Sequence, residues 1–181
     1  MKHRWTAALL ALALVLALPF SAAAETFSTE DFTMEIPEGT YVFTPTTSTE
    51  DPNWAMAGVA NPESELSTLA EMNGVAELVT EDGETTILVQ QQESDQTQAY
   101  FNLRYLTEEQ QADFLDAIMQ SQTDEITVDK YYLDVDGQPF YRIRIDGTYQ
   151  ETGYHELIYG TIVNGFTLAF NIYGGEESVT Q

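Results

Sequence analysis

Few side chains in this sequence combine the residue types and the spacing that metal binding or catalysis requires. The segment His155-Glu156-Leu157-Ile158-Tyr159 begins like the zinc motif H-E-x-x-H, in which two histidines share one face of a helix. The second histidine is absent, the segment alternates as a strand does, and His155 is the only histidine beyond the N-terminal segment. We therefore expect His155 to be a sheet histidine near a strand end, and we predict no zinc site.

Acidic residues suggest calcium at two places. Asp134-Val135-Asp136-Gly137 matches the start of a calcium loop, but the later oxygen ligands and the final bidentate glutamate are missing. A hairpin turn accounts for these residues better, because Asp-Gly supplies the positive φ values of a two-residue turn. Weak calcium binding by the predicted acidic loop Glu93-Ser94-Asp95 stays open, with no defined metal site.

Charged pairs give two further candidates. Arg142 and Arg144 alternate on one strand face, where they would form either a carboxylate clamp or cross-strand pairs with Asp129 and other acids. We favour the pairs, because opposite charges commonly meet across strands. Two carboxylates would serve a glycosidase, but 30 acidic residues make chance pairs inevitable.

No other catalytic motif is present. The sequence has no glycine-rich phosphate loop, no G-x-S-x-G motif and no cysteine. We predict no catalytic, cofactor-binding or metal-binding residue and no cofactor, and we expect a protein that is not an enzyme. The aromatic residues have strand spacing and are expected in the core, except that polar neighbours would leave Trp54 exposed.

The net charge limits the partners. Residues 25–181 hold all 30 Asp and Glu but only four Lys and Arg, so their formal charge is −26. This acidity argues against binding to nucleic acid or to anionic lipid, and it favours at most a cationic partner. An acidic surface is also common in exported or salt-adapted proteins. Without cysteine, stability must come from packing alone.

The first 24 residues have the three parts of a bacterial secretory signal peptide. Positive residues at 2–4 precede an apolar run from Ala7 to Leu18, and Ala22 and Ala24 occupy the positions that a signal peptidase reads. The run is 12 residues long, whereas a membrane-spanning helix needs about 20. We expect cleavage after Ala24, a secreted, extracellular or cell-envelope location, and no membrane insertion of the remaining chain.

Residues 25–120 are predicted to mix strands and helices. The strands are expected at 32–36, 41–43, 85–91 and 100–103, the loops at 44–53 and 92–98, and a helix between Pro62 and Asn73. Residues 75–80 fit either a strand or more helix. A further helix is predicted at 108–120, because Thr107 and Gln110 form a capping box and an apolar stripe follows.

From residue 126 onward a period of two predicts four strands, at 126–135, 139–146, 154–163 and 166–173. Short connections at Asp136-Gly137, 147–153 and Asn164-Gly165 imply an antiparallel meander.

The turns also set the register of this meander. A turn at Asn164-Gly165 pairs Val163 with Phe166, Thr161 with Leu168, Tyr159 with Phe170 and Leu157 with Ile172. We expect this apolar face to lie under the 108–120 helix, with Glu156, Gly160, Thr167 and Asn171 on the opposite face. A turn at Asp136-Gly137 pairs Asp129 with Arg144 and Tyr131 with Arg142, and it puts Tyr132, Tyr141, Ile143 and Ile145 on the core side.

Residues 25–181 are therefore expected to form a single α+β domain, an antiparallel sheet packed against helices. The acidic residues 176–181 look like the first turn of a helix, so we expect the natural chain to continue into one.

The opening Phe32-Thr33-Met34-Glu35-Ile36-Pro37-Glu38-Gly39 resembles the start of PsbP/Mog1-like domains, where a first strand runs into a Pro-x-Gly turn. The order of elements over residues 27–176 is similar too. The resemblance implies a sandwich of an antiparallel sheet between helices, in a family whose members mostly bind proteins or small ligands and are generally not enzymes. No motif here matches a functional residue of that family, and its last helix is missing.

Three functions fit these observations. The first is a secreted, non-enzymatic binding or accessory domain that contacts a protein or a cell-envelope component. The second is a glycan-active hydrolase, which requires a deep pocket with two carboxylates of different pKa. The third is a domain that binds a small molecule in a cavity against the sheet.

Overall fold

The computed structural model describes residues 11–12, 25–119, 127–135, 137–149 and 152–174. The chain divides into two compact units, residues 1–40 and 41–181, and the expectation of one domain over 25–181 stays a prediction. The signal peptide and the predicted start of a last helix lie outside the described residues, apart from the two-residue strand β1 (Ala11–Leu12). No helix in the described ranges has the length and apolarity to span a membrane.

The first unit holds a small sheet in the order β1-β3-β2. Strands β2 (Glu25–Ser28) and β3 (Thr33–Ile36) are antiparallel. Met34 and Ile36 are buried while Glu35 between them is exposed, so the predicted alternation is confirmed.

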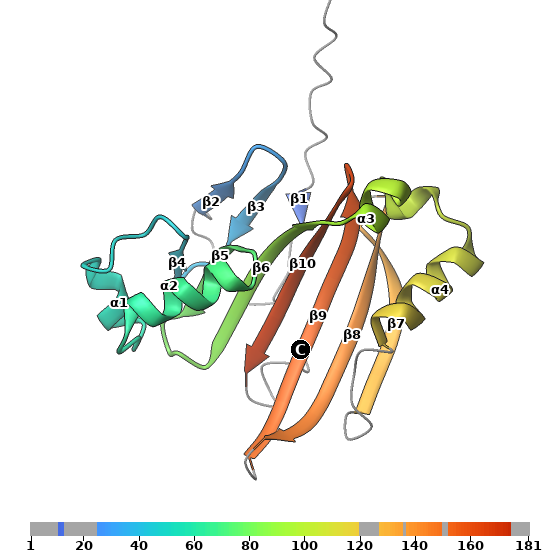
Figure 1. Ribbon diagram of the computed structural model, residues 1–181. Coiled ribbons are helices and arrows are strands. Elements are labelled where there is room, and N and C mark those ends of the chain that lie inside the picture. The colour runs from blue at the N-terminus through green and yellow to red at the C-terminus, as the bar shows by residue number, and fades with distance from the viewer. Residues whose placement is uncertain (1–10, 13–24, 120–126, 136, 150–151, 175–181) are drawn as a thin grey trace, which may run out of the picture. The chain divides into compact units, whose positions relative to one another are not determined.

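The second unit is built on a seven-stranded sheet in the order β4-β5-β6-β10-β9-β8-β7 (Figure 1). Its strands are β4 (Thr40–Phe43), β5 (Gly74–Thr80), β6 (Thr85–Glu93), β7 (Thr127–Val135), β8 (Gln138–Tyr149), β9 (Thr152–Val163) and β10 (Phe166–Gly174). From β5 to β7 every recorded pairing is antiparallel, which confirms the α+β class and the four-strand meander. Residues 75–80 are strand rather than helix.

The predicted register of the meander is confirmed. Tyr159 pairs with Phe170 and Leu157 with Ile172 across the turn at Asn164-Gly165, whose φ values are 52° and 85°. Asp129 pairs with Arg144 in the β7–β8 hairpin. Strands β8 and β9 extend through most of the connection predicted at 147–153.

The described residues of the second unit form five short helical elements. They are α1 (Pro52–Met56), α2 (Pro62–Glu71), α3 (Asp95–Tyr100), the 3₁₀ helix η1 (Leu103–Tyr105) and α4 (Glu108–Met119). Helix α4 begins with the predicted capping box: the Thr107 amide donates to Gln110 Oε1 at 2.9 Å, and the Gln110 amide donates to Thr107 Oγ1 at 3.3 Å. The predictions of a loop at 92–98 and a strand at 100–103 were wrong, because Ser94 caps α3 with a box of its own.

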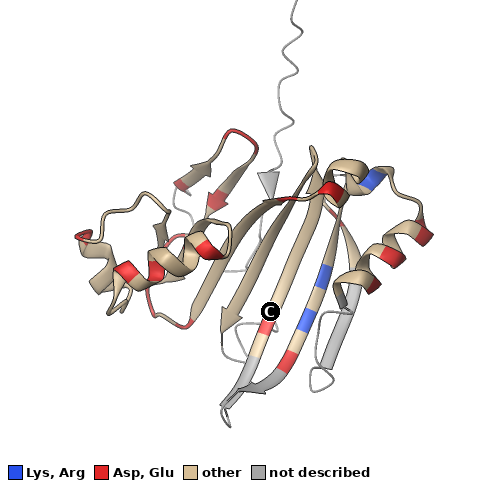
Figure 2. Ribbon diagram, in the orientation of Figure 1, with Lys and Arg blue, Asp and Glu red and all other residues tan. Residues whose placement is uncertain are grey.

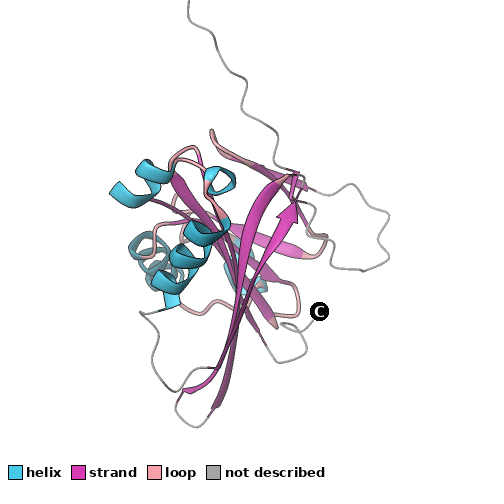
Figure 3. Ribbon diagram, turned by 90° about the vertical axis from the view of Figure 1, so that its right-hand side faces the viewer, coloured by secondary structure: helices cyan, strands magenta, loops and turns pink. Residues whose placement is uncertain are grey.

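Helix α4 lies on the face of the meander opposite to the one predicted (Figures 1 and 3). Phe114 and Leu115 pack with Tyr141, Ile143, Ile145 and Ile162, whereas Tyr159 and Phe170 point to the other face. Gly160 makes room on this helix face, because a Cβ there would lie 2.1 Å from the Tyr141 ring. The choice of face was wrong because both faces are apolar: Leu168 and Phe170 are also buried.

The prediction that Trp54 is exposed was wrong as well. Its ring stacks on Phe43 with centroids 3.6 Å apart, and its indole N–H donates to the Ser48 carbonyl at 2.8 Å. The side chain is therefore buried with its one polar atom satisfied.

Candidate functional site

A pocket of about 300 Å³ lies between α2 and the face of the sheet on which α4 also packs. One face of α2, at the spacing i, i+3, i+4 and i+7, supplies Glu65, Thr68, Leu69 and Met72. The sheet supplies Glu77 from β5, Thr86 and Leu88 from β6, and Tyr173 from β10. The pocket thus combines apolar walls with a few polar groups, as small-ligand sites do.

The register of the sheet brings these residues together. Glu77 pairs directly with Leu88, and Thr86 pairs with Tyr173. Residues that pair directly point to the same face, so all four project toward α2. Tyr173 in turn pairs with Glu156 of β9, so Thr86, Tyr173 and Glu156 form a row of polar residues across three strands that extends beyond the pocket.

The C-terminal end of α2 is fixed to the sheet beside the pocket. Gln90 Nε2 donates to the Met72 carbonyl at 2.7 Å, and Asn171 Nδ2 donates to Gln90 Oε1 at 2.5 Å. The next strand starts at once, because Gly74 has no side chain to collide with Leu69, whose Cδ1 would lie 2.2 Å from a Cβ there. These contacts hold the helical wall of the pocket in place.

Glu77 and Glu65 form a pair of carboxyl groups in this pocket. Glu77 is only 9% exposed. Burial raises the pKa of Glu77 to about 7, and the charge of Glu65 and a hydrogen bond between the two side chains add to this effect. Glu77 therefore keeps its proton up to near neutral pH, and its protonated carboxyl group can donate to Glu65.

A third carboxyl group lies next to this pair. Glu156 is buried and hydrogen-bonds to Tyr173. Burial, together with the charge of Glu156, raises the pKa of the Tyr173 hydroxyl, which therefore stays protonated and donates to the carboxylate. No lysine or arginine is among the residues that line the pocket in the described chain, and the blue segments of Figure 2 fall on β8 and near η1.

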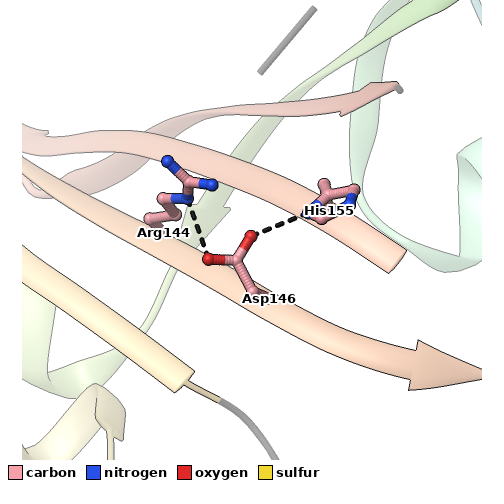
Figure 4. Close-up of polar contacts among 3 residues, drawn as sticks. All are labelled: Arg144, Asp146 and His155. Atoms are coloured by element: carbon pink, nitrogen blue, oxygen red, sulfur yellow. Dashed lines mark hydrogen bonds and ion pairs between the residues drawn. The ribbon is translucent and has the colours of Figure 1, made fainter. Parts of the chain in front are cut away.

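His155 forms a second polar group with Asp146 and Arg144 (Figure 4). The register places this group on the face of the sheet opposite to Glu156 and the pocket. Asp146 Oδ1 lies 2.8 Å from His155 Nδ1, and Asp146 Oδ2 accepts from Arg144 Nε at 2.9 Å. The hydrogen bond with His155 and then that from Arg144 hold the pKa of Asp146 below its ordinary value. Arg144 thus pairs with an acid, as predicted, but the acid is two residues along its own strand.

The surroundings of His155, as far as they are described, hold neither a hydroxyl partner nor a metal-binding cluster. Across the described ranges, no serine or threonine hydroxyl hydrogen-bonds to His155, and no cluster of three or more His, Asp or Glu side chains is placed to hold a metal ion. The hairpin interpretation of Asp134 is supported, because its carboxylate accepts from the Gly137 amide at 2.9 Å. Asp136 lies outside the described residues. The acidic segment at 93–95 ends β6 and starts α3 rather than forming a loop.

No site residue was predicted from the sequence, and neither Glu65 nor Glu77 was singled out. One signal was available: Glu77 interrupts the apolar strand segment 74–79. A lone acid inside an apolar strand marks a charge that is expected to be buried. Glu65 carries no comparable signal, because acids are common on helices.

Comparisons with known proteins give a structural likeness of low similarity. No protein-family model and no curated protein matches the sequence. Among solved structures, the chain is similar to the cyanobacterial PsbP protein (CyanoP) from Synechocystis sp. PCC 6803, with a TM-score of 0.45 and 12% sequence identity. The match covers 91% of this chain and 88% of that one. The resemblance to PsbP-like domains is thereby confirmed as a resemblance, and it does not extend to a site or an activity.

Proposed function

We propose that this chain is a secreted, non-enzymatic binding domain whose ligand group enters the pocket between α2 and the sheet. The observation that carries the proposal is the pocket itself, a cavity of about 300 Å³ lined by both apolar and ionisable side chains. Its volume lies at the lower end of ligand sites, which are about 300–1,000 Å³. A short group, either free or on the surface of a partner, therefore fits better than an extended polymer.

The raised pKa of Glu77 is the one observation that favours the alternative of a glycan hydrolase. The spacing of the acids argues against it. Glycosidases hold their two carboxyl groups about 5–5.5 Å apart when retaining and about 6.5–9.5 Å apart when inverting. Glu65 and Glu77 interact directly in the pocket, so they lie closer together than either arrangement requires.

A fragment screen on the exported protein tests the proposal. We expect small compounds to shift the amide resonances of Thr86, Leu88 and Tyr173. A Thr68→Trp variant should abolish these shifts by filling the pocket, whereas Ser67→Trp, on the adjacent exposed position of α2, should not. Compounds that bind elsewhere, or equally well to both variants, would contradict the proposal.

Activity assays test the non-enzymatic part separately. Wild type and Glu77→Gln should show the same background rate on chromogenic glycosides. A rate that is present in wild type and lost in Glu77→Gln would establish the hydrolase instead.

A further inference from the structure

We propose that the group bound in this pocket is a primary ammonium on an apolar stem, such as a short alkylamine or a lysine side chain. This inference rests on the proposed function and adds the chemical class of the ligand. Four features of the site lead to it.

The first feature is the uncompensated negative charge of the pocket. Glu65 of α2 and Glu77 of β5 both line it, and the described residues that line it include no cation. An ammonium group can take the place of the proton on Glu77 and donate to both carboxylates at once, since it has three N–H donors. Hydrogen bonds between charged partners are stronger than those between neutral ones.

The second feature is the apolar part of the lining. Leu69 and Leu88 are buried, and Met72 is 38% exposed at the end of α2. Methylene groups that lead to the ammonium would contact these side chains, and methionine adapts to stems of different shape. A bare inorganic cation would leave these walls unused.

The third feature is the small number of oxygen ligands. Calcium takes about 6–8 oxygens, whereas the described pocket offers two carboxyl groups, two threonine hydroxyls and one tyrosine hydroxyl that already bonds to Glu156. No metal-binding cluster of three or more His, Asp or Glu occurs among the residues described. The donor set therefore suits an organic cation better than a metal ion.

The fourth feature is the long-range field. The formal charge of −24 for the whole chain attracts cations and repels anions at a distance. The third carboxyl group, Glu156, adds to the local potential on the β10 side of the pocket. A cationic ligand is therefore favoured both during approach and after binding.

Titration by nuclear magnetic resonance with n-butylammonium, n-butanol and butyrate at pH 8 tests this inference. The three probes share a stem and differ in charge. We expect butylammonium to shift the amides of Thr86, Leu88 and Tyr173 with a Kd at least about tenfold below that of butanol, because it adds charged hydrogen bonds. Nα-acetyl-lysine methylamide, added as a second ammonium probe, shows whether the pocket also accepts a side chain of a protein.

Two variants sharpen the result. Glu77→Gln should weaken butylammonium binding at least about fivefold, whereas Glu71→Gln, which removes the same charge from an exposed position of α2, should leave it unchanged. Lowering the pH to 5.5 should weaken binding to wild type, because the proton on Glu77 then competes with the ammonium group. Tyr173 and Glu156, the other ionisable groups beside the pair, are present in all these variants.

Other outcomes would overturn the inference. Equal binding of butanol and butylammonium would mean that the pocket takes a neutral group, in which case the binding function stands and the ammonium fails. Calcium chloride that shifts the same amides and displaces butylammonium would establish a metal site. Absence of shifts from every probe and every fragment would refute the proposed function as well.

Discussion

Burial of the Glu77 carboxyl group should make the wild-type protein less stable as the pH rises toward 8. Replacing Glu77 with glutamine should remove most of this loss. The native pKa of about 7 lies above the ordinary value of 4.5. The folded protein therefore holds a proton on Glu77 at pH values where the unfolded chain has already released it. Stability from this group is fully present below pH 4.5, falls between pH 4.5 and 7, and stays low above pH 7.

The size of the effect follows from the two pKa values. Each pKa unit corresponds to about 1.4 kcal/mol, so a rise from 4.5 to about 7 amounts to about 3 kcal/mol over the whole range. Of this, about 2 kcal/mol falls between pH 5.5 and pH 8. Glutamine has nearly the same shape and does not ionise, so the variant lacks this decrease.

Urea denaturation of the exported wild type and of Glu77→Gln at pH 5.5, 6.5, 7.5 and 8 measures how the difference in their stability changes with pH. Trp54 fluorescence reports unfolding, because that side chain is buried and is the only tryptophan beyond residue 24. The stability of the variant relative to wild type should rise by about 2 kcal/mol from pH 5.5 to pH 8. Glu71→Gln, at an exposed position of the same helix, should show a flat difference. A flat difference for Glu77→Gln would refute the buried-acid reasoning.

Three further predictions follow from the packing. Glu65→Gln should lower the pKa of Glu77 without returning it to 4.5, because burial is the larger cause; carbon-13 titration of the carboxyl measures this, and an unchanged pKa would contradict the pairing. Gly160→Ala should lose about 2 kcal/mol or more in urea denaturation, because its Cβ would lie 2.1 Å from Tyr141; the loss should shrink in a Tyr141→Leu background, and equal losses would contradict the contact. Phe101 has a φ of 59°, so Phe101→Gly should be about 1 kcal/mol more stable than Phe101→Ala in the same assay, and the reverse order would contradict backbone strain there.

Strand register was predictable because it depends on local information. Turn residues fix where each hairpin reverses, and the period of two then fixes which residues share a face. The pairing of Tyr159 with Phe170 needed nothing more than the turn at Asn164-Gly165. Helix α4 was predictable for the same reason, since its capping box and apolar stripe lie within a few turns.

The side of the sheet that carries α4 depends on contacts between distant segments. A sheet that is apolar on both faces offers two surfaces of similar composition, so composition alone does not show which face the helix covers. In the sequence, Gly160 is only a residue with low strand propensity. The strand pairing is needed to show that the ring of Tyr141 occupies the space above it. The burial of Trp54 likewise depends on Phe43, and the polar neighbours of the tryptophan gave the opposite indication.

In the sequence, the one sign of the pocket is Glu77, an acid whose burial in an apolar strand destabilises the fold. Ala76 and Leu78 point to the face opposite α2, whereas Glu77 shares the face of the helix with the apolar Val79. A leucine there would stabilise the fold at neutral pH, because it needs no proton and no partner. Natural sequences break such local rules mainly at functional positions. An acid kept at a buried strand position without a cation beside it in the pocket is therefore better explained by something it binds than by its packing. The glutamine variant separates these two explanations by becoming more stable while losing its affinity for butylammonium.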